Sequence, residues 1–320
     1  MPERSDEYSM ATSPATPWHR WLAFAVIVVT GVAYGAVAPF VRIPLARIDS
    51  FIPTMMAIAF VTDLITALLL FGQFSITGSR ALLLLASGYL FSSLIAIPFA
   101  LTFPGAFAPT GLLGAGSQSA AWLSVFYRFG FSAATVGYAL LIPGKHTKDP
   151  IGLSPRPGIF WSVAIVIIVV CALTSAVTAG HDLMPRLLSD SILPLGHYVN
   201  GIIALLLLWF RGKSVLDLWL MVTACALAME TSLTAFLVTT RFSVGFYATR
   251  LIPFIVSKAV LIVLLSETLI LNERLASAFI LQRRERENRL MSVDAATAAI
   301  AHEIKQPLTA ISARCSAALR

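Results

Sequence analysis

Long apolar runs separated by shorter polar connections fill the first 271 residues of the chain. A helix that crosses the hydrocarbon core of a bilayer, about 30 Å thick, needs roughly 20 mainly apolar residues at about 1.5 Å per residue. Eight runs meet this requirement. The pattern therefore predicts membrane-spanning helices at residues 21–38, 53–72, 81–101, 117–142, 158–178, 194–210, 216–239 and 244–271.

The pattern changes after Leu271. Residues 272–320 contain no glycine and are rich in Ala, Leu, Glu and Arg, so they predict one long helix that continues from the last span. A set of apolar or small positions steps by three and four along this helix, as in the seam of a two-stranded coiled coil. Its members are Leu290, Val293, Thr297, Ile300 and Ile304. A lone helix cannot bury such a seam, so a homodimer is predicted.

Composition places these helices in a membrane. Of the 320 residues 58% are hydrophobic and 12% are charged, with a mean hydropathy of +0.83, whereas a soluble domain usually carries about twice that charged fraction. The predicted fold class is all-α and integral to the membrane, a bundle of eight transmembrane helices continuing into a cytoplasmic coiled-coil helix. The net charge of +7 does not indicate nucleic acid, because Lys and Arg sit mainly where topology and anionic lipid explain them.

Basic residues orient the bundle, because cytoplasmic connections carry an excess of Lys and Arg. With the N-terminus inside, the inner connections hold Arg4, Arg20, Arg80, Lys145, Lys148, Arg156, Arg211 and Lys213, and the outer ones hold Arg42, Arg47, Arg186 and Arg241. Both termini are therefore expected in the cytoplasm, with residues 1–17 as a disordered tail. The connections at 39–52, 102–116 and 179–193 are expected to face outward as packed, partly re-entrant loops.

Six ionisable residues fall within the predicted spans: Asp63, Arg128, Glu230, Arg250, Lys258 and Glu267. Each costs on the order of 3 kcal/mol if it faces lipid, so we expect all six to face the bundle interior and to pair. Asp63 and Arg128 lie at a similar depth, about 15 Å from the outer ends of their spans, which makes them candidate partners. Glu230 falls between Arg250 and Lys258 in depth, and Glu267 lies near the cytoplasmic end, within reach of the headgroups.

Two interpretations of this polar core stay open. The six residues form internal ion pairs that fix helix packing, or they line a site that binds a small molecule or titrates and so shifts the last span. No metal site is predicted. An outer cluster carries ligand types that Zn and Cu accept but lacks a tight spacing, and its members are His181, Asp182, Asp190 and His197.

The stretch AAIAHEIKQPLTAI, residues 298–311, places reactive groups on the polar helix. With Ile300 in the seam, His302 lies about 200° further round the helix, on the outer face. An exposed imidazole is a good nucleophile toward phosphorus near neutral pH. Glu303 can take up its proton or hold its tautomer. Pro307 lacks an N–H group and is expected to bend the helix about one turn after the histidine.

The motif IAHEIKQPLTAI resembles the H-box of sensor histidine kinases, which lies in the first helix of the dimerisation and phosphoacceptor domain. The resemblance implies that His302 receives the γ-phosphoryl group of ATP with the help of Glu303, and that a receiver-domain aspartate of a response regulator later accepts it. Gln306 stands where many members carry the Thr or Asn that orients a water for dephosphorylation. It also occupies the position where a zinc protease motif would need a second His.

Residues 272–320 are thus expected to form a signalling helix and the first helix of a truncated phosphoacceptor domain. The domain that binds ATP and Mg lies outside this sequence, so the chain as given is expected to bind no cofactor and not to phosphorylate itself. Two explanations stay open: the chain is a fragment of a longer kinase, or it is a phosphoacceptor served by the catalytic domain of another protein.

Residues 18–271 resemble a second family. The segments FVTDLITALLLFGQF, LASGYLF and ALTFPGAFAPTGLLGAGSQSAAWL are similar to the membrane-associated sensor domain of the fourth type. That family is an eight-span module at the N-terminus of bacterial histidine kinases and diguanylate cyclases. The resemblance implies a sensor in the bacterial inner membrane with an unidentified ligand. Phe99 and Arg128 stand where members often carry His, which argues against haem or metal.

The sequence therefore predicts the membrane sensor of a two-component system, with a response regulator as its partner. Two alternatives from other classes stay open: a transporter or channel whose tail merely dimerises, and a non-catalytic receptor that acts through partners. Matching Gly- or Pro-interrupted spans in the two halves would favour a transporter, and the sequence has no convincing repeat of this kind.

Overall fold

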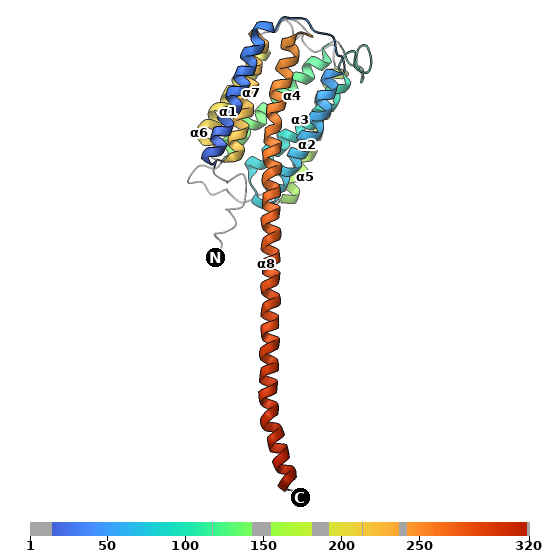
Figure 1. Ribbon diagram of the computed structural model, residues 1–320. Coiled ribbons are helices and arrows are strands. Elements are labelled where there is room, and N and C mark those ends of the chain that lie inside the picture. The colour runs from blue at the N-terminus through green and yellow to red at the C-terminus, as the bar shows by residue number, and fades with distance from the viewer. Residues whose placement is uncertain are drawn as a thin grey trace. The chain divides into compact units, whose positions relative to one another are not determined.

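The computed structural model describes residues 15–116, 118–142, 155–180, 192–212, 214–236 and 242–318. Almost all of the tail predicted at 1–17, together with His181, Asp182 and Asp190, lies outside these ranges. The chain divides into two compact units, Met1–Leu265 and Ser266–Arg320. The first unit contains the helical bundle, and the second contains the later turns of its last helix (Figure 1).

Every regular element in the described part of the chain is helical. The elements are α1 (Pro17–Val37), η2 (Ala38–Phe40), α2 (Phe51–Thr77), α3 (Arg80–Leu101), α4 (Ser119–Leu141), α5 (Pro155–Thr178), α6 (Ile192–Arg211), α7 (Val215–Phe236) and α8 (Val244–Ala318). Each predicted span coincides with one α-helix.

Six of these helices, within the described residues, are long and apolar enough to cross a membrane: α1, α2, α3, α5, α7 and α8. The prediction of spans is confirmed for these six, and the protein is a multi-pass membrane protein. The regions predicted as the fourth and sixth spans form α4 and α6, which do not pass the same test. Helix α4 is less apolar because it carries Arg128 together with several hydroxyl groups, and α6 is described in full only from Val199. The count of eight spans stays a prediction.

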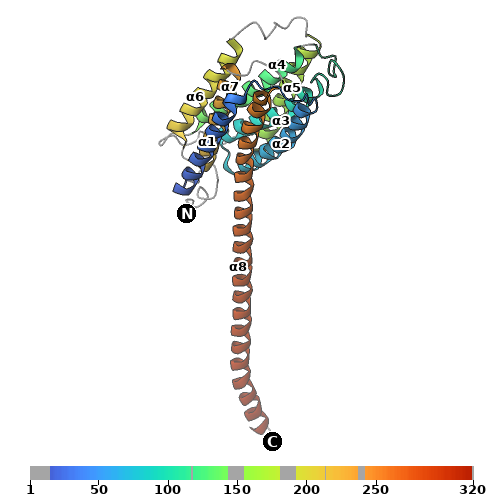
Figure 2. The same cartoon turned by 45° about the horizontal axis from the view of Figure 1, so that its top comes forward.

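Helices α2 and α3 form a tight hairpin. Helix α2 ends where Gly78 adopts a left-handed backbone with φ of 67° and donates its N–H to the carbonyl of Phe74 at 2.8 Å, a C-terminal cap that glycine accepts without steric cost. Phe74 and Leu85 are both fully buried between the two helices and their neighbours. Both views place this hairpin and α5 on one side of the first turns of α8, with α1, α6 and α7 on the other (Figures 1 and 2).

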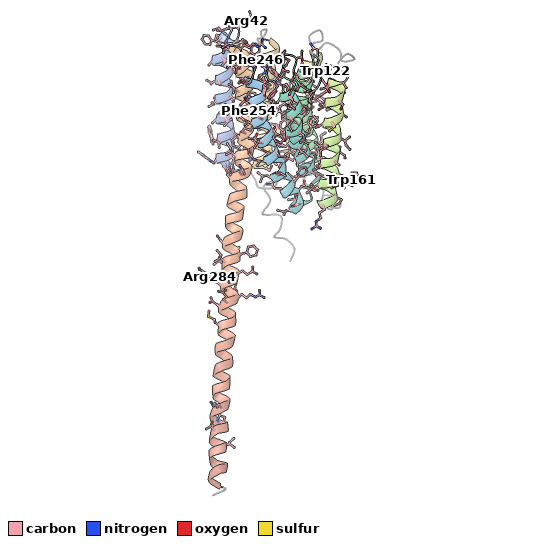
Figure 3. All side chains as sticks on the ribbon, turned by 90° about the vertical axis from the view of Figure 1, so that its right-hand side faces the viewer. Arg42, Trp122, Trp161, Phe246, Phe254 and Arg284 are labelled. Carbon is pink, nitrogen blue, oxygen red and sulfur yellow. The ribbon has the colours of Figure 1, made fainter. Side chains whose placement is uncertain are left out.

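The outer surface of the bundle is apolar, as lipid requires. Large side chains on α1 and α5 are more than half exposed, among them Val29 at 67% and Ile168 at 65%. Trp161 is 64% exposed and lies near the end of the bundle opposite Arg42 (Figure 3). An amphipathic aromatic ring at this level is typical of a membrane interface.

Helices α3 and α4 approach each other closely at two glycine residues, which have no Cβ atom to keep them apart. A Cβ atom on Gly88 of α3 would overlap the side chain of Ala134, and one on Gly130 of α4 would overlap the ring of Phe91. Small residues let two membrane helices pack backbone against backbone, where van der Waals contact replaces the missing hydrophobic drive. This contact fixes the position of α4, which carries Arg128.

The start of α7 is closed by a capping box. The backbone N–H of Asp217 donates to the Ser214 hydroxyl at 3.1 Å, and the N–H of Ser214 donates to the Asp217 carboxylate at 2.9 Å. The hydroxyl of Tyr138 on α4 donates to the same carboxylate at 2.6 Å. The cap satisfies backbone donors that a helix start leaves open and ties α7 to α4.

Replacing Ser214 by Ala is expected to lower the free energy of unfolding by about 1 kcal/mol, because the N–H of Asp217 loses its acceptor. Reversible unfolding in mixed micelles, followed by tryptophan fluorescence, measures this change. Ser75→Ala is the matched control, since this exposed hydroxyl only bonds back to the carbonyl of Gly72 within its own helix. An equal loss in both variants would show that the cap contributes nothing.

The connection between η2 and α2 packs along the start of α8, which confirms the prediction of a packed loop at 39–52. The N–H of Leu45 donates to the carbonyl of Phe242 at 2.8 Å, and the N–H of Val244 donates to the carbonyl of Ile43 at 3.0 Å. The hydroxyl of Tyr247 donates to the carbonyl of Ala46 at 2.8 Å. The first turn of α8 is therefore fastened to this loop by backbone bonds.

The second unit is a single helical segment, which confirms the long helix predicted after Leu271. Helix α8 stays helical through Pro307, an exposed residue, and its last turns curve away from the axis of the turns before them (Figure 1). The side chains predicted to form the dimer seam lie outside what the structure describes, and the dimer stays a prediction.

Candidate functional site

An ion pair joins α2 to α8 inside the bundle. The Nζ atom of Lys258 lies 2.7 Å from Oδ1 of Asp63, and the two side chains are 17% and 10% exposed. Lys258 also lies 4.8 Å from the ring centroid of Phe254. Removal of either charge leaves the other uncompensated in a poorly solvated interior, where that costs several kcal/mol.

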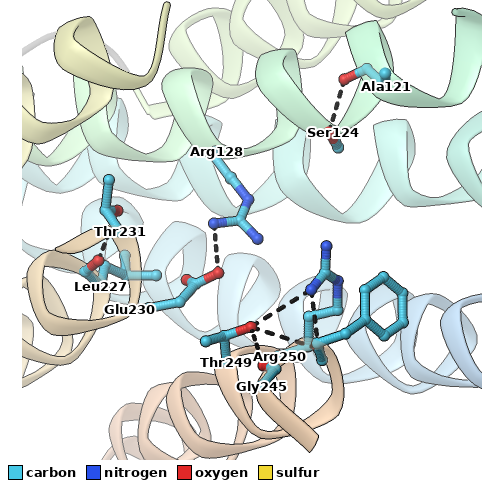
Figure 4. Close-up of polar contacts among 10 residues, drawn as sticks. Ala121, Ser124, Arg128, Leu227, Glu230, Thr231, Gly245, Thr249 and Arg250 are labelled. Atoms are coloured by element: carbon cyan, nitrogen blue, oxygen red, sulfur yellow. Dashed lines mark hydrogen bonds and ion pairs between the residues drawn. The ribbon is translucent and has the colours of Figure 1, made fainter. Parts of the chain in front are cut away.

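A second ion pair joins α4 to α7. Nη1 of Arg128 lies 2.5 Å from Oε1 of Glu230, whose side chain is only 3% exposed (Figure 4). The side chain of Arg128 is 32% exposed. The carboxylate is therefore the more deeply buried partner, and it depends on the guanidinium for its charge balance.

These pairs differ from the one that depth along the spans suggested. Asp63 pairs with Lys258 rather than with Arg128, so the candidate pairing of Asp63 and Arg128 was wrong. Depth constrains a partner only along the membrane normal, whereas the face of each helix decides which side chains meet. The expectation that intramembrane charges pair is confirmed for these four residues. The side chain of Glu267 lies outside what the structure describes.

The side chain of Arg250 in α8 is held in place by residues of the same helix. Its Nη1 atom donates to the carbonyl of Phe246 at 2.8 Å and to the Thr249 hydroxyl at 3.4 Å, and its guanidinium lies 3.8 Å from the ring centroid of Phe246. Stacking on an aromatic face suits the planar guanidinium. These contacts aim the group toward α4, into the space that Arg128 enters from the other side (Figure 4).

A cavity of about 300 Å³ lies among α2, α3, α4, α7 and α8. Its wall carries both carboxylates, both arginines and the hydroxyl of Tyr127, among many aromatic side chains. The Oη atom of Tyr89 and the Oγ atom of Ser92 also belong to buried wall residues and have no hydrogen-bond partner. Polar groups inside an apolar wall are typical of small-molecule sites.

A second cavity of about 450 Å³ lies among α4, α6, α7 and α8. It shares six wall residues with the first, and these include Arg128 and Arg250. The two guanidinium groups therefore stand where the cavities meet. The described residues that line the second cavity include no carboxylate.

The motif of the second unit is placed only by its backbone. His302, Glu303 and Gln306 lie in α8, and their side chains are outside what the structure describes. Their roles stay predictions. Among the described residues no group of three His, Cys, Asp or Glu side chains is arranged to hold a metal ion.

The chain matches a known family of membrane domains. The sequence profile of the family MASE4, described as a membrane-associated sensor, integral membrane domain, matches residues 46–272. No curated protein and no solved structure matches the chain. The match covers more than half of the chain, including both ion pairs and both cavities. The chain therefore belongs to the MASE4 family of membrane-associated sensor domains.

Proposed function

We propose that the protein is the sensor of a two-component system, in which the MASE4 domain controls ATP-dependent phosphorylation of His302. The observation that carries the proposal is the sequence HEIKQP, residues 302–307, on the same helix that holds Arg250 and Lys258 in the sensor domain. The motif supplies the acceptor chemistry, and membership of the sensor family supplies the input.

The phosphorylation step follows from the chemistry of imidazole. A ring nitrogen of neutral His302 attacks the γ-phosphorus of ATP, the bond from that phosphorus to the bridging oxygen breaks, and ADP leaves. Glu303 takes up the ring proton or holds the reactive tautomer. A catalytic domain supplies ATP and Mg, and a receiver-domain aspartate of a response regulator then accepts the phosphoryl group.

The signal travels along α8 in this proposal. A ligand or a change of charge in the polar core alters the contacts of Arg250 and Lys258, and a continuous helix passes a shift or rotation to His302. The phosphoacceptor works as a homodimer through the seam that contains Ile300 and Ile304. Both termini face the cytoplasm of a bacterium, and the bundle lies in the inner membrane.

Replacing His302 by Gln is expected to abolish phosphorylation, since the amide has no nucleophilic nitrogen. Membranes from cells that produce the protein from its own chromosomal locus contain whatever catalytic domain serves it. The measurement is transfer of label from γ-labelled ATP to the protein, with stability of the label in base and its loss in acid.

The matched control is His19→Gln, a histidine in the first turn of α1 that pairs with Thr16. This variant should keep its label. Label that persists in the His302 variant, or that is stable in acid, would contradict the proposal. Absence of label from the unaltered protein would favour a non-catalytic receptor.

A further inference from the structure

We propose that the second cavity binds a small organic monocarboxylate, with its carboxylate between Arg128 and Arg250 and its apolar body against α4 and α7. This inference names the ligand class of the sensor and so deepens the proposed function. It is tested by binding alone, so its failure would leave the phosphorylation of His302 untouched.

The meeting of two cations is the first argument. Arg128 and Arg250 both belong to the wall of the first cavity and to the wall of the second. Two like charges close together in a membrane interior repel each other at a high cost. A carboxylate placed between the two guanidinium groups offsets that repulsion.

The position of the arginines is the second argument. Lys258 and both carboxylates are absent from the described lining of the second cavity, whereas both guanidinium groups line it. An anion placed there meets two cations and no lining carboxylate. The planar guanidinium recognises a carboxylate by two parallel hydrogen bonds, which a rounder cation cannot do.

The remaining wall fits the rest of such a molecule. Leu220 and Leu227 supply apolar surface, and the Oγ atoms of Ser132 and Thr234 line the cavity without a hydrogen-bond partner. Gly201 of α6 faces open space, since a Cβ atom built there meets nothing within 4 Å. A volume of about 450 Å³ lies within the usual range of small-molecule pockets.

The experiment uses phenylacetate as the probe and phenylacetamide as its neutral isostere. The 320-residue chain is placed in lipid nanodiscs, and equilibrium binding of radiolabelled probe is measured. We expect saturable binding of one phenylacetate per chain and at least tenfold weaker binding of the amide. Arg250→Gln should weaken phenylacetate at least tenfold, and Arg250→Lys should fall between this variant and the unaltered protein.

Two further variants keep the test decisive. Gly201→Leu fills the cavity without a clash at Cβ, so it should abolish binding while the thermal midpoint stays or rises, even if Arg250→Gln fails to fold. Arg47→Gln removes an arginine whose side chain is 62% exposed and should bind as the unaltered protein does.

Three results would overturn the proposal: equal binding of acid and amide, unchanged binding in Gly201→Leu, or no saturable binding of phenylacetate. Palmitate serves as a competitor, because a fatty acid from the bilayer shares the carboxylate. Binding of palmitate without phenylacetate would also overturn the proposal, since it would assign the site to lipid.

Discussion

Replacing Lys258 by Met is expected to lower the free energy of unfolding by about 3–5 kcal/mol, because Asp63 stays behind in the bundle without its cation. The Nζ atom of Lys258 is 2.7 Å from Asp63, and the carboxylate side chain is only 10% exposed. Methionine keeps much of the length and apolar body of lysine, so the loss reports the charge rather than a cavity. Reversible unfolding in mixed micelles measures it.

The double variant Asp63→Asn with Lys258→Met separates the energy of the contact between the two residues from the effect of each single substitution. Since neither residue is then charged, we expect the double variant to recover most of the loss, and the coupling energy of the cycle gives the strength of the contact. Arg47→Met is the control, because the exposed pair of Arg47 with Asp49 is worth about 1 kcal/mol or less. Losses that simply add in the double variant would argue against the contact.

The sequence was sufficient to locate the helices but not to determine which side chains meet between them. Apolar runs locate spans because every backbone group in lipid must bond within its own helix, and each predicted span coincides with one α-helix. The partners of Asp63 and Arg128 could not be derived in this way. They depend on which face each helix turns toward its neighbours. For Arg128, the close packing of Gly88 against Ala134 and of Gly130 against Phe91 sets the rotation of α4.

A signal for the second cavity was nevertheless present in the sequence. Polar residues recur along α4 at Ser124, Arg128, Ser132 and Thr135, steps of four, four and three that place them on one face of a helix. All four line the second cavity. On α7, Thr231 and Thr234 line the same cavity. The charged residues of the spans indicate Arg128 alone on this face, whereas the periodicity of the hydroxyl groups around it indicates the cavity.

Reversing the charge of Arg128 tests directly whether its ion-pair partner is Glu230 or Asp63. Arg128→Glu places a second carboxylate beside Glu230, whose side chain is 3% exposed, and a like charge in the membrane interior adds repulsion to the lost pair. We expect little folded protein from this variant, measured as the monodisperse yield after detergent extraction. Glu230→Arg in the same chain restores one charge of each sign and should recover most of that yield.

The matched control reverses Asp63 instead. Asp63→Arg combined with Arg128→Glu also leaves one charge of each sign, but it faces Lys258 with a second cation and leaves Glu230 beside a carboxylate. If Asp63 and Arg128 were partners, this variant would be the one to recover. Recovery only with Glu230→Arg follows from the geometry in which α4 pairs with α7 and α2 pairs with α8. The two crossed variants thus distinguish pairing by helix face from pairing by depth, because depth alone treats Asp63 as the better partner.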